Sequence, residues 1–339
     1  MKQNLQHRQR GVGIAELMVS MTIGLLVTLA VATLFLSTRK DYRENDATAK
    51  MQENVRFTLE LLSNDLRHAG FFGNIPDPGD INVDTLTVAA PSVDCGATTA
   101  SGKAGLYNFT KTHSLLSYGY QIADAGSFYG TCLSTSEVKA NSNILIIKRV
   151  AGEPTAPLTD TDANDDRLTK TPYVYANGSS AVLYTLPLTT ALPFAGGQHW
   201  AYQPRIYYID PSNRLCRKQL NNLTMVSEPL ADGIEAFHVE FGIDTVSSGL
   251  YDGAPGYFYK PTANVDPDTA TDMDQAVSAT IFVLGRTTDP DPDTNYRDTK
   301  TYQLGATGPT IPAANDRFHR RVYSLTVALK NIRNQVMSR

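Results

Sequence analysis

Glu16 is the residue whose chemistry most needs an explanation, because it is a carboxylate within an apolar run of about 25 residues, 12–36. An ionised carboxylate inside a membrane-spanning helix costs about 2.5 to 3.5 kcal/mol, so Glu16 needs a cationic partner. Cleavage of the chain after Gly11 would create an α-amino group at Val12 and make Glu16 the fifth residue of the new chain. A helix cannot comfortably fold Glu16 back onto its own terminus, so we expect the terminus of a neighbouring subunit to pair with it. Such a head-to-tail contact, if it does not close into a ring, builds an open helical filament.

Acidic, proline-containing tracts are the second place where residue spacing suggests chemistry. Two of them put side-chain oxygens at alternate residues, which is the spacing of a calcium loop. The residues are Asp160, Asp162 and Asn164 in one tract and Asp289, Asp291 and Asp293 in the other. Neither tract has the glycine and the glutamate that an EF-hand loop uses at its sixth and twelfth positions. We interpret both as solvated surface loops, with calcium binding as the alternative, and expect no other metal or cofactor.

Three cysteines, Cys95, Cys132 and Cys216, bear on the redox environment. In an oxidising compartment two of three should pair, and Cys95 with Cys132 is the pair closer in sequence. The sequence leaves the connectivity open. Cys216 is expected to be a quiet, half-buried thiol.

The chain offers little for an enzyme. Its six histidines are scattered, and neither a G-x-S-x-G nor an H-E-x-x-H motif occurs. His238 alternates with its neighbours on an expected strand and is interpreted as structural, and Trp200 is interpreted as a packed side chain. We therefore predict a protein that is not an enzyme.

The charge balance argues against nucleic acid as a partner. The chain has 30 basic and 34 acidic residues, and removal of a leader containing Lys2, Arg8 and Arg10 leaves 27 basic residues and a net charge of −7. Nucleic-acid binding needs a positive surface, which this composition does not favour.

The apolar run must sit on an element that positions Glu16. Residues 12–36 are long enough to span a hydrocarbon core of about 30 Å as a helix. The basic residues before the run predict a cytoplasmic leader and a head that is exported across the inner membrane. Cleavage as an ordinary secretory signal at the A-x-A site of residues 30–32 and an uncleaved signal anchor are the alternatives.

A second, amphipathic helical pattern follows the apolar run. Its apolar residues recur every three or four positions and are Val55, Leu59, Leu62, Leu66 and Ala69. Because no glycine or proline lies between Leu25 and Ala69, we predict one helix from about Gly13 to His68. That helix would be roughly 80 Å long and would end at Gly70 as its cap. Neither an ordinary signal nor a plain anchor requires such a helix.

The sequence after Gly70 predicts a β-rich region. Short alternating runs bounded by turn residues predict strands at 143–150, 205–209, 236–242, 277–284 and 321–329, with a turn at residues 211–213. We predict an α+β fold in which the long helix packs on an antiparallel sheet with large loop insertions. The expected division is a leader at 1–11, a transmembrane half-helix at 12–36, an amphipathic half-helix at 37–69 and a head at 70–339.

The N-terminal residues carry a family resemblance. Gly11 followed by VGIAELMVSMTIGLL resembles the class III signal of type IV pilins, with a glycine before the cleaved bond and a glutamate at the fifth mature position. Val12 stands where phenylalanine is common, and Gly13 and Ala15 stand where larger residues are common. The resemblance implies cleavage between Gly11 and Val12 by a prepilin peptidase and N-methylation of Val12.

Three segments of the head are similar to the minor pilins of the PilW family, which share an architecture with the J-type pseudopilins of type II secretion. The segments are RIYYIDPSNRLCRKQL, EPLADGIEAFHVEFGID and RRVYSLTVALKNIR. This resemblance implies a low-abundance subunit that joins other minor pilins at the filament tip and primes assembly of the major pilin. It leaves open a role in displaying a tip adhesin.

The resemblance also implies a place in the cell. The subunit is expected in the inner membrane before assembly, with its N-terminus cytoplasmic and its head periplasmic, and afterwards at the pilus tip. Two alternatives follow in order: a J-like pseudopilin of a type II secretion system, and a signal-anchored periplasmic binding or hydrolytic protein.

Overall fold

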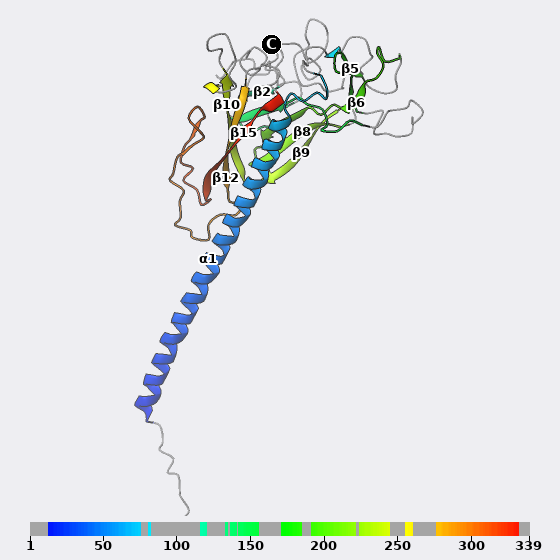
Figure 1. Ribbon diagram of the computed structural model, residues 1–339. Helices are drawn as coiled ribbons and strands as arrows, with labels where there is room; N and C mark the ends of the chain where they lie inside the picture. Colours follow the sequence, from blue (N-terminus) through cyan, green and yellow to red (C-terminus); the bar gives the residue numbers. More distant parts are fainter. Residues whose placement is uncertain are drawn as a thin grey trace, which may run out of the picture.

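The computed structural model describes residues 13–75, 81–82, 116–120, 133–134, 136–140, 142–155, 171–184, 191–221, 224–244, 255–259 and 276–331. One helix, α1 (Ile14–His68), runs through 55 residues, and its first half projects away from a β-rich head (Figure 1). The chain leaves the helix through Gly70, whose φ of +72° is the left-handed conformation typical of a residue just beyond a helix end. The long helix and its predicted end are therefore confirmed.

The first sheet has the strand order β11-β10-β12-β15 and is antiparallel throughout. Its strands are β10 (Ile234–Asp244), β11 (Pro255–Tyr259), β12 (Ala276–Arg286) and β15 (Arg320–Ala328). The strands predicted at 236–242, 277–284 and 321–329 correspond to β10, β12 and β15.

The second sheet has the order β2-β3-β7-β8-β9 and is also antiparallel. Its strands are β2 (Leu116–Tyr120), β3 (Asn143–Ile147), β7 (Arg205–Ile209), β8 (Arg214–Asn221) and β9 (Thr224–Asp232). The turn between β7 and β8 is the predicted one, with Asn213 at φ +59° and the Asp210 side chain accepting hydrogen bonds from the amides of Ser212 and Arg214, both 2.9 Å.

Two smaller sheets complete the described part of the head. One has the order β1-β5-β4-β6 and is antiparallel except for the parallel pair β1 and β5. Its strands are β1 (Ile81–Asn82), β4 (Tyr173–Ala176), β5 (Ala181–Tyr184) and β6 (Gln198–Ala201). The other pairs β13 (Tyr302–Gln303) with β14 (Thr310–Ile311).

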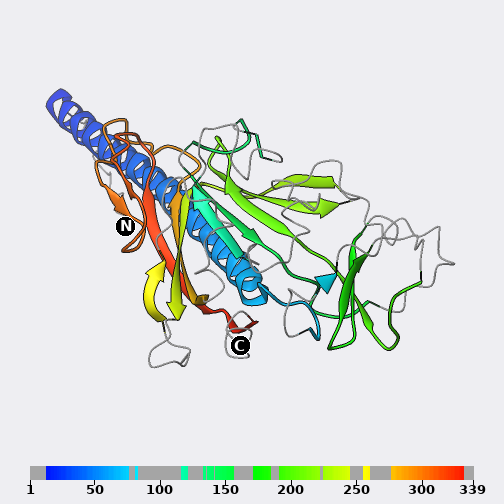
Figure 2. The ribbon, with the colours of Figure 1, turned by 90° about the horizontal axis from the view of Figure 1, so that it is seen from above.

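The second half of α1 is the shared core of the two large sheets. All five residues of the predicted stripe belong to this core: Val55, Leu62, Leu66 and Ala69 are buried, and Leu59 packs partly buried against them. The first sheet contributes cross-strand rows such as Val239, Ile281 and Leu325, and the second contributes Leu145, Tyr207 and Ile209, among others. Seen from above, the helix lies between the orange-to-red strands and the teal-to-green strands (Figure 2). The predicted α+β class is confirmed, with two large sheets on the helix where one was expected.

A buried ionic cluster interrupts this apolar seam. The Asp65 carboxylate, 1% exposed, pairs with Arg205 at 2.5 Å and with Arg149 at 3.0 Å, and the Tyr207 hydroxyl donates a further hydrogen bond to it. Burial alone would raise the pKa of Asp65, but the hydrogen bond and charge of Arg205, with the Tyr207 and Arg149 contacts, hold that pKa below its ordinary value. The cluster ties the helix to β7 and to Arg149, two residues beyond the end of β3.

A single glycine joins the two large sheets. Gly233 stands between β9 and β10 with φ at +71°, and its carbonyl accepts a hydrogen bond from the Arg286 amide at 2.7 Å. A Cβ at this position would lie 2.3 Å from the Arg286 carbonyl oxygen. The close approach and the left-handed backbone therefore both require glycine.

Asp65→Asn should destabilise the head by about 3 to 5 kcal/mol, because it leaves two largely buried guanidinium groups without their counter-charge. The measurement is chemical unfolding of the full-length protein in detergent micelles. Glu60→Gln, an acid-to-amide change at an exposed position of the same helix, is the matched control and should change stability little. An Asp65→Asn protein as stable as the control would contradict this account of the cluster.

The same cluster predicts a pH dependence. Because the folded-state pKa of Asp65 is lowered, its contribution is fully present above the unfolded pKa of about 3.9 and is lost as pH falls through the folded pKa. The stability difference between wild type and Asp65→Asn should therefore be constant near neutral pH and shrink below about pH 4. A difference that stays the same down to acid denaturation would show that Asp65 ionisation does not contribute.

Gly233→Ala should destabilise the protein by about 2 to 5 kcal/mol, because a left-handed backbone is strained for alanine and the new methyl group meets a carbonyl oxygen. Gly196→Ala is the matched control, since Gly196 has a similar φ of +76° but nothing within 4 Å of its added Cβ. The control should lose only about 1 to 2 kcal/mol in the same unfolding measurement. Equal losses would mean that the contact with Arg286 is unimportant.

Candidate functional site

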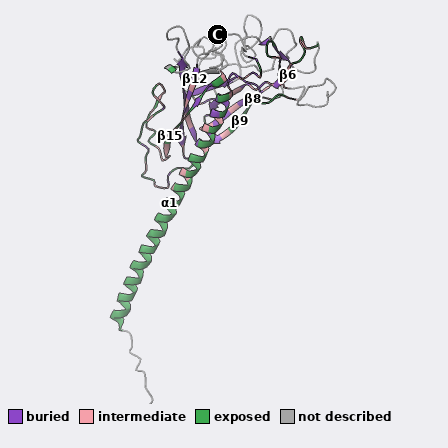
Figure 3. Cartoon of the chain, in the orientation of Figure 1, coloured by how far each residue is buried: buried purple, intermediate pink, exposed green. Residues whose placement is uncertain are grey.

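The projecting half of α1 is an apolar surface that the head does not cover. Every residue from Gly13 to Arg39 is exposed (Figure 3), including Ile14 at 83% and Leu25 at 70%. By length and composition, α1 is the one helix in the described part of the chain that could cross a membrane. Apolar surface on this scale is stable only when lipid or other apolar side chains cover it.

Glu16 lies in the first turn of this projecting half and is exposed. No cationic group among the described residues pairs with its carboxylate. A negative charge in the first turn of a helix is favoured by the unpaired backbone N–H groups there, typically by about 0.3 to 1 kcal/mol. That is less than the cost of burying a carboxylate in an apolar environment, so a full counter-charge must come from outside the described residues.

Several residues singled out in the sequence lie outside the described residues. They are Gly11 and Val12 of the cleavage motif, Cys95 and Cys132 of the expected disulfide, and Asp160, Asp162 and Asn164 of the first acidic tract. Their roles stay predictions. The third cysteine, Cys216, is a free thiol at 5% exposure, and burial raises its pKa to about 11, so it is unreactive at neutral pH.

His238 and Trp200 both lie within the packed head. Burial lowers the pKa of His238 to about 4, and its ring contacts the Thr307 hydroxyl at 3.1 Å, so it is a neutral structural side chain. Trp200 packs edge-on against Phe71, with ring centroids 5.6 Å apart, in the core of the β1-β5-β4-β6 sheet. These contacts are those of packed side chains, as the sequence indicated.

The second acidic tract does not arrange its aspartates as a calcium loop. Asp289 is exposed, whereas Asp291 is buried, with its carboxylate 2.6 Å from Nε2 of His319. Asp293 instead pairs with Lys40 of α1 at 2.9 Å, and that contact lowers the pKa of Asp293. The interpretation as a solvated loop is therefore wrong for Asp291. Its partner lies 28 residues away, which local spacing cannot show.

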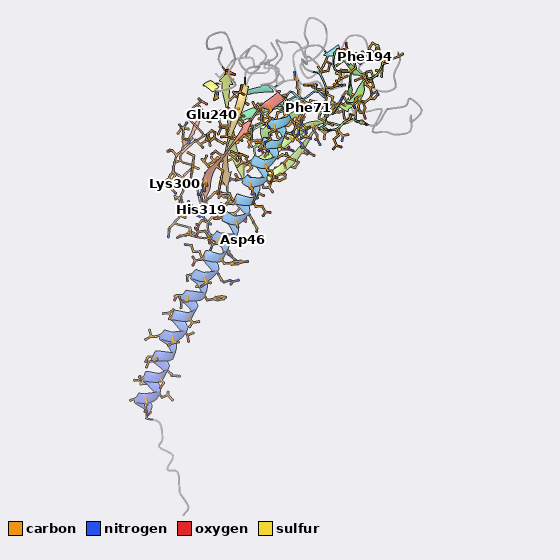
Figure 4. The ribbon with its side chains drawn as sticks, in the orientation of Figure 1. Asp46, Phe71, Phe194, Glu240, Lys300 and His319 are labelled. Atoms are coloured by element: carbon orange, nitrogen blue, oxygen red, sulfur yellow. The ribbon has the colours of Figure 1, made fainter. Side chains whose placement is uncertain are left out.

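The tract belongs to the segment 287–319, which connects β12 to β15 and lies against α1. The end of the segment next to β15, its base, is held by Arg320. The Arg320 side chain is 2% exposed and pairs with Glu235 at 2.6 Å, Asp316 at 2.6 Å and Asp298 at 3.1 Å. These contacts raise the pKa of Arg320 despite its burial. Where the segment meets the helix, a hollow of about 420 Å³ opens between them, close to the labelled His319 and Asp46 in Figure 4.

Sequence reasoning missed the buried ionic cluster around Asp65, although part of the signal was present. Asp65 falls on the apolar face of α1, between Leu62 and Leu66, and an acid within such a stripe indicates a buried partner. Arg205 and Tyr207 alternate on one strand and so share a face. No sequence feature connects Asp291 to His319, which lies 28 residues further along the chain.

Comparisons with known proteins match the head to a pilus family. Residues 206–331 match the family model of Type IV Pilus-assembly protein W. Among solved structures, the Type IV-like pilin TTHA1219 from Thermus thermophilus is similar, with a TM-score of 0.34 and 12% identity, over 84% of this chain and 98% of that one. A search of curated proteins found no match. The resemblance to the PilW family is thus confirmed for residues 206–331, which run from β7 through β15.

Proposed function

We propose that this chain is a minor pilin of the type IV pilus that primes assembly and forms part of the complex at the filament tip. It acts as a structural subunit and catalyses no reaction. Its partners are the other minor pilins and the major pilin, with a tip adhesin as a further candidate. The subunit waits in the inner membrane, with its N-terminus cytoplasmic and its head periplasmic, until assembly moves it to the pilus tip.

The observation that carries the proposal is the division of α1 into two halves with opposite environments. Its second half is buried by the two large sheets, while the half from Gly13 to Arg39 is exposed along its whole length. A periplasmic protein that only needs an anchor requires a membrane-spanning helix, but that helix need not continue as the central helix of the head's core. A filament subunit does require one continuous helix. Its projecting half must leave the lipid and pack against the helices of neighbouring subunits while it stays attached to the head.

Glu16 supplies the contact that makes this exchange specific. Its carboxylate is exposed near the start of the helix, with no cation from the described residues beside it. A terminal amine at Val12 of a neighbouring subunit would neutralise it where apolar helices pack together, and the ion pair would strengthen as water is excluded. The pair would also fix the axial position of each subunit.

The size of the head supports a position at the tip. About 270 residues follow α1, which is a large volume for a subunit that repeats along a shaft. A subunit at the tip meets neighbours on one side only, so a bulky head costs nothing in packing there.

Processing provides the first test. We expect the full-length protein, expressed in membranes, to be cut between Gly11 and Val12 and N-methylated at Val12 only when a prepilin peptidase is co-expressed. The measurement is the mass of the N-terminal peptide with and without the peptidase. A mature chain that starts at Thr33, or an uncut chain in both samples, would exclude a pilin-type subunit.

Replacement of the carboxylate provides the second test. Glu16→Val should leave membrane insertion intact and should strongly reduce recruitment into the minor-pilin complex and surface piliation, because the partner amine loses its counter-charge. Ser20→Val, one turn further along the same helix, is the matched control and should assemble normally. Normal piliation in Glu16→Val would refute the role of this residue, and a loss of protein secretion with intact pili would point to the J-like pseudopilin instead.

A further inference from the structure

A histidine and two carboxylates from distant parts of the chain converge where α1 leaves the head. Glu44 comes from the helix, whereas Asp291 and His319 come from the segment 287–319. One ligand atom from each lies within 4.8 Å of the other two. The Nε2 atom of His319 is 2.6 Å from Oδ2 of Asp291 and 3.9 Å from Oε1 of Glu44. The cluster lines the hollow between the helix and this segment.

Two of the three groups, His319 and Asp291, are oriented by contacts through atoms other than the Nε2 and Oδ2 that converge. Those two atoms share a hydrogen bond at 2.6 Å, which a bound ion would replace with release of the shared proton. The His319 ring stacks on Tyr296, with centroids 4.2 Å apart, and its main chain exchanges hydrogen bonds with Thr287. The second oxygen of Asp291 accepts a hydrogen bond from the Asp293 amide at 2.6 Å. Outer contacts of this kind orient the ligands in metal sites.

The third group, Glu44, can adjust its position. Its side chain is 42% exposed and extends from a helix whose backbone is fixed. The hollow therefore has two anchored ligands and one adaptable ligand, which together could close around an ion that enters from solvent.

The charge of the hollow favours a cation. Its lining includes four carboxylates, from Glu44, Asp46, Asp289 and Asp291, against the guanidinium groups of Arg43 and Arg317. With His319 neutral, the formal balance is −2. Arg317 is turned to the main chain, since it donates hydrogen bonds to the Asp291 carbonyl at 2.7 and 3.1 Å. Asp46 is paired with Lys50.

We propose that Glu44, Asp291 and His319 bind a first-row divalent metal ion of the zinc type. One imidazole nitrogen with two carboxylate oxygens suits such an ion better than calcium, which takes oxygen ligands. Bond lengths of about 2.0 to 2.2 Å place tetrahedral ligand atoms roughly 3.3 to 3.6 Å apart. The present separations are 2.6 and 3.9 Å, so side-chain shifts below about 1 Å would suffice for these contacts.

The bound ion would join the helix to the β12–β15 segment. His319 lies directly before Arg320, the buried residue that fixes the base of this segment. A metal contact to Glu44 would extend that rigid attachment to the helix, close to the end of the apolar run. The site would thus join the head to α1 at Glu44, five residues beyond the projecting half.

The test uses the full-length protein in detergent micelles after removal of metal with a chelator. Added ZnCl₂ should raise the melting temperature, and about one zinc per chain should remain after desalting. Glu44→Gln and His319→Asn should each weaken zinc affinity by at least about tenfold, the loss that even an outer partner of a ligand causes. Glu44→Gln removes an exposed group and should leave folding unaffected, so the test does not depend on His319→Asn folding normally.

His68→Asn is the matched control, because His68 lies at the far end of α1 with its ring against the Asn64 carbonyl. It should bind zinc as wild type does. Zinc retention that is unchanged in Glu44→Gln and His319→Asn would overturn the proposal, as would no retention by wild type. A rise in melting temperature with CaCl₂ and none with ZnCl₂ would overturn it as well.

Discussion

The packing of one half of α1 between two sheets is the constraint on which the rest of the structure depends. Met51 to Ala69 supply apolar side chains to a core that neither sheet completes alone. The sheets meet covalently at Gly233, where a left-handed backbone that glycine adopts readily lets β9 turn into β10. If the helix were absent, both large sheets would expose the faces that form this shared core, and only the smaller clusters elsewhere in the head would stay covered.

Asp65 gives this packing its register. Apolar contacts along a helix tolerate sliding, but a buried carboxylate with two arginine partners fits at one position only, because any displacement leaves buried charges unpaired. A rigid helix carries that register outward. Glu16 lies about 75 Å along the axis from Asp65, at 1.5 Å per residue. The position of the exposed carboxylate relative to the head is therefore set by an ionic cluster at the opposite end of the helix.

Local periodicity predicted the long helix and five strands, but it missed β8 and β9 and could not predict which side chains pair across the fold. The stripe from Val55 to Ala69 and the alternation in β15 follow from burial of one face, which sequence spacing records directly. The partners of Asp65 lie 84 and 140 residues away, that of Lys40 lies 253 residues away, and that of Asp291 lies 28 residues away. Strands of the small β1-β5-β4-β6 sheet were missed because each is four residues or fewer, too short for alternation to stand out.

The segment 287–319 shows why such distant partners matter for function. The ion pair between Lys40 and Asp293 is 38% exposed on each side, so solvent and salt screen it as they screen other surface pairs. It cannot hold the segment against the helix by itself. Arg320, with three carboxylate partners and a side chain 2% exposed, anchors only the base. The contact between the segment and the helix lies beside Arg43, Glu44 and Ala47 of α1, just after the apolar run. Anything that binds Glu44 and His319 together would stiffen the attachment of the head at the level where the helix enters its second environment.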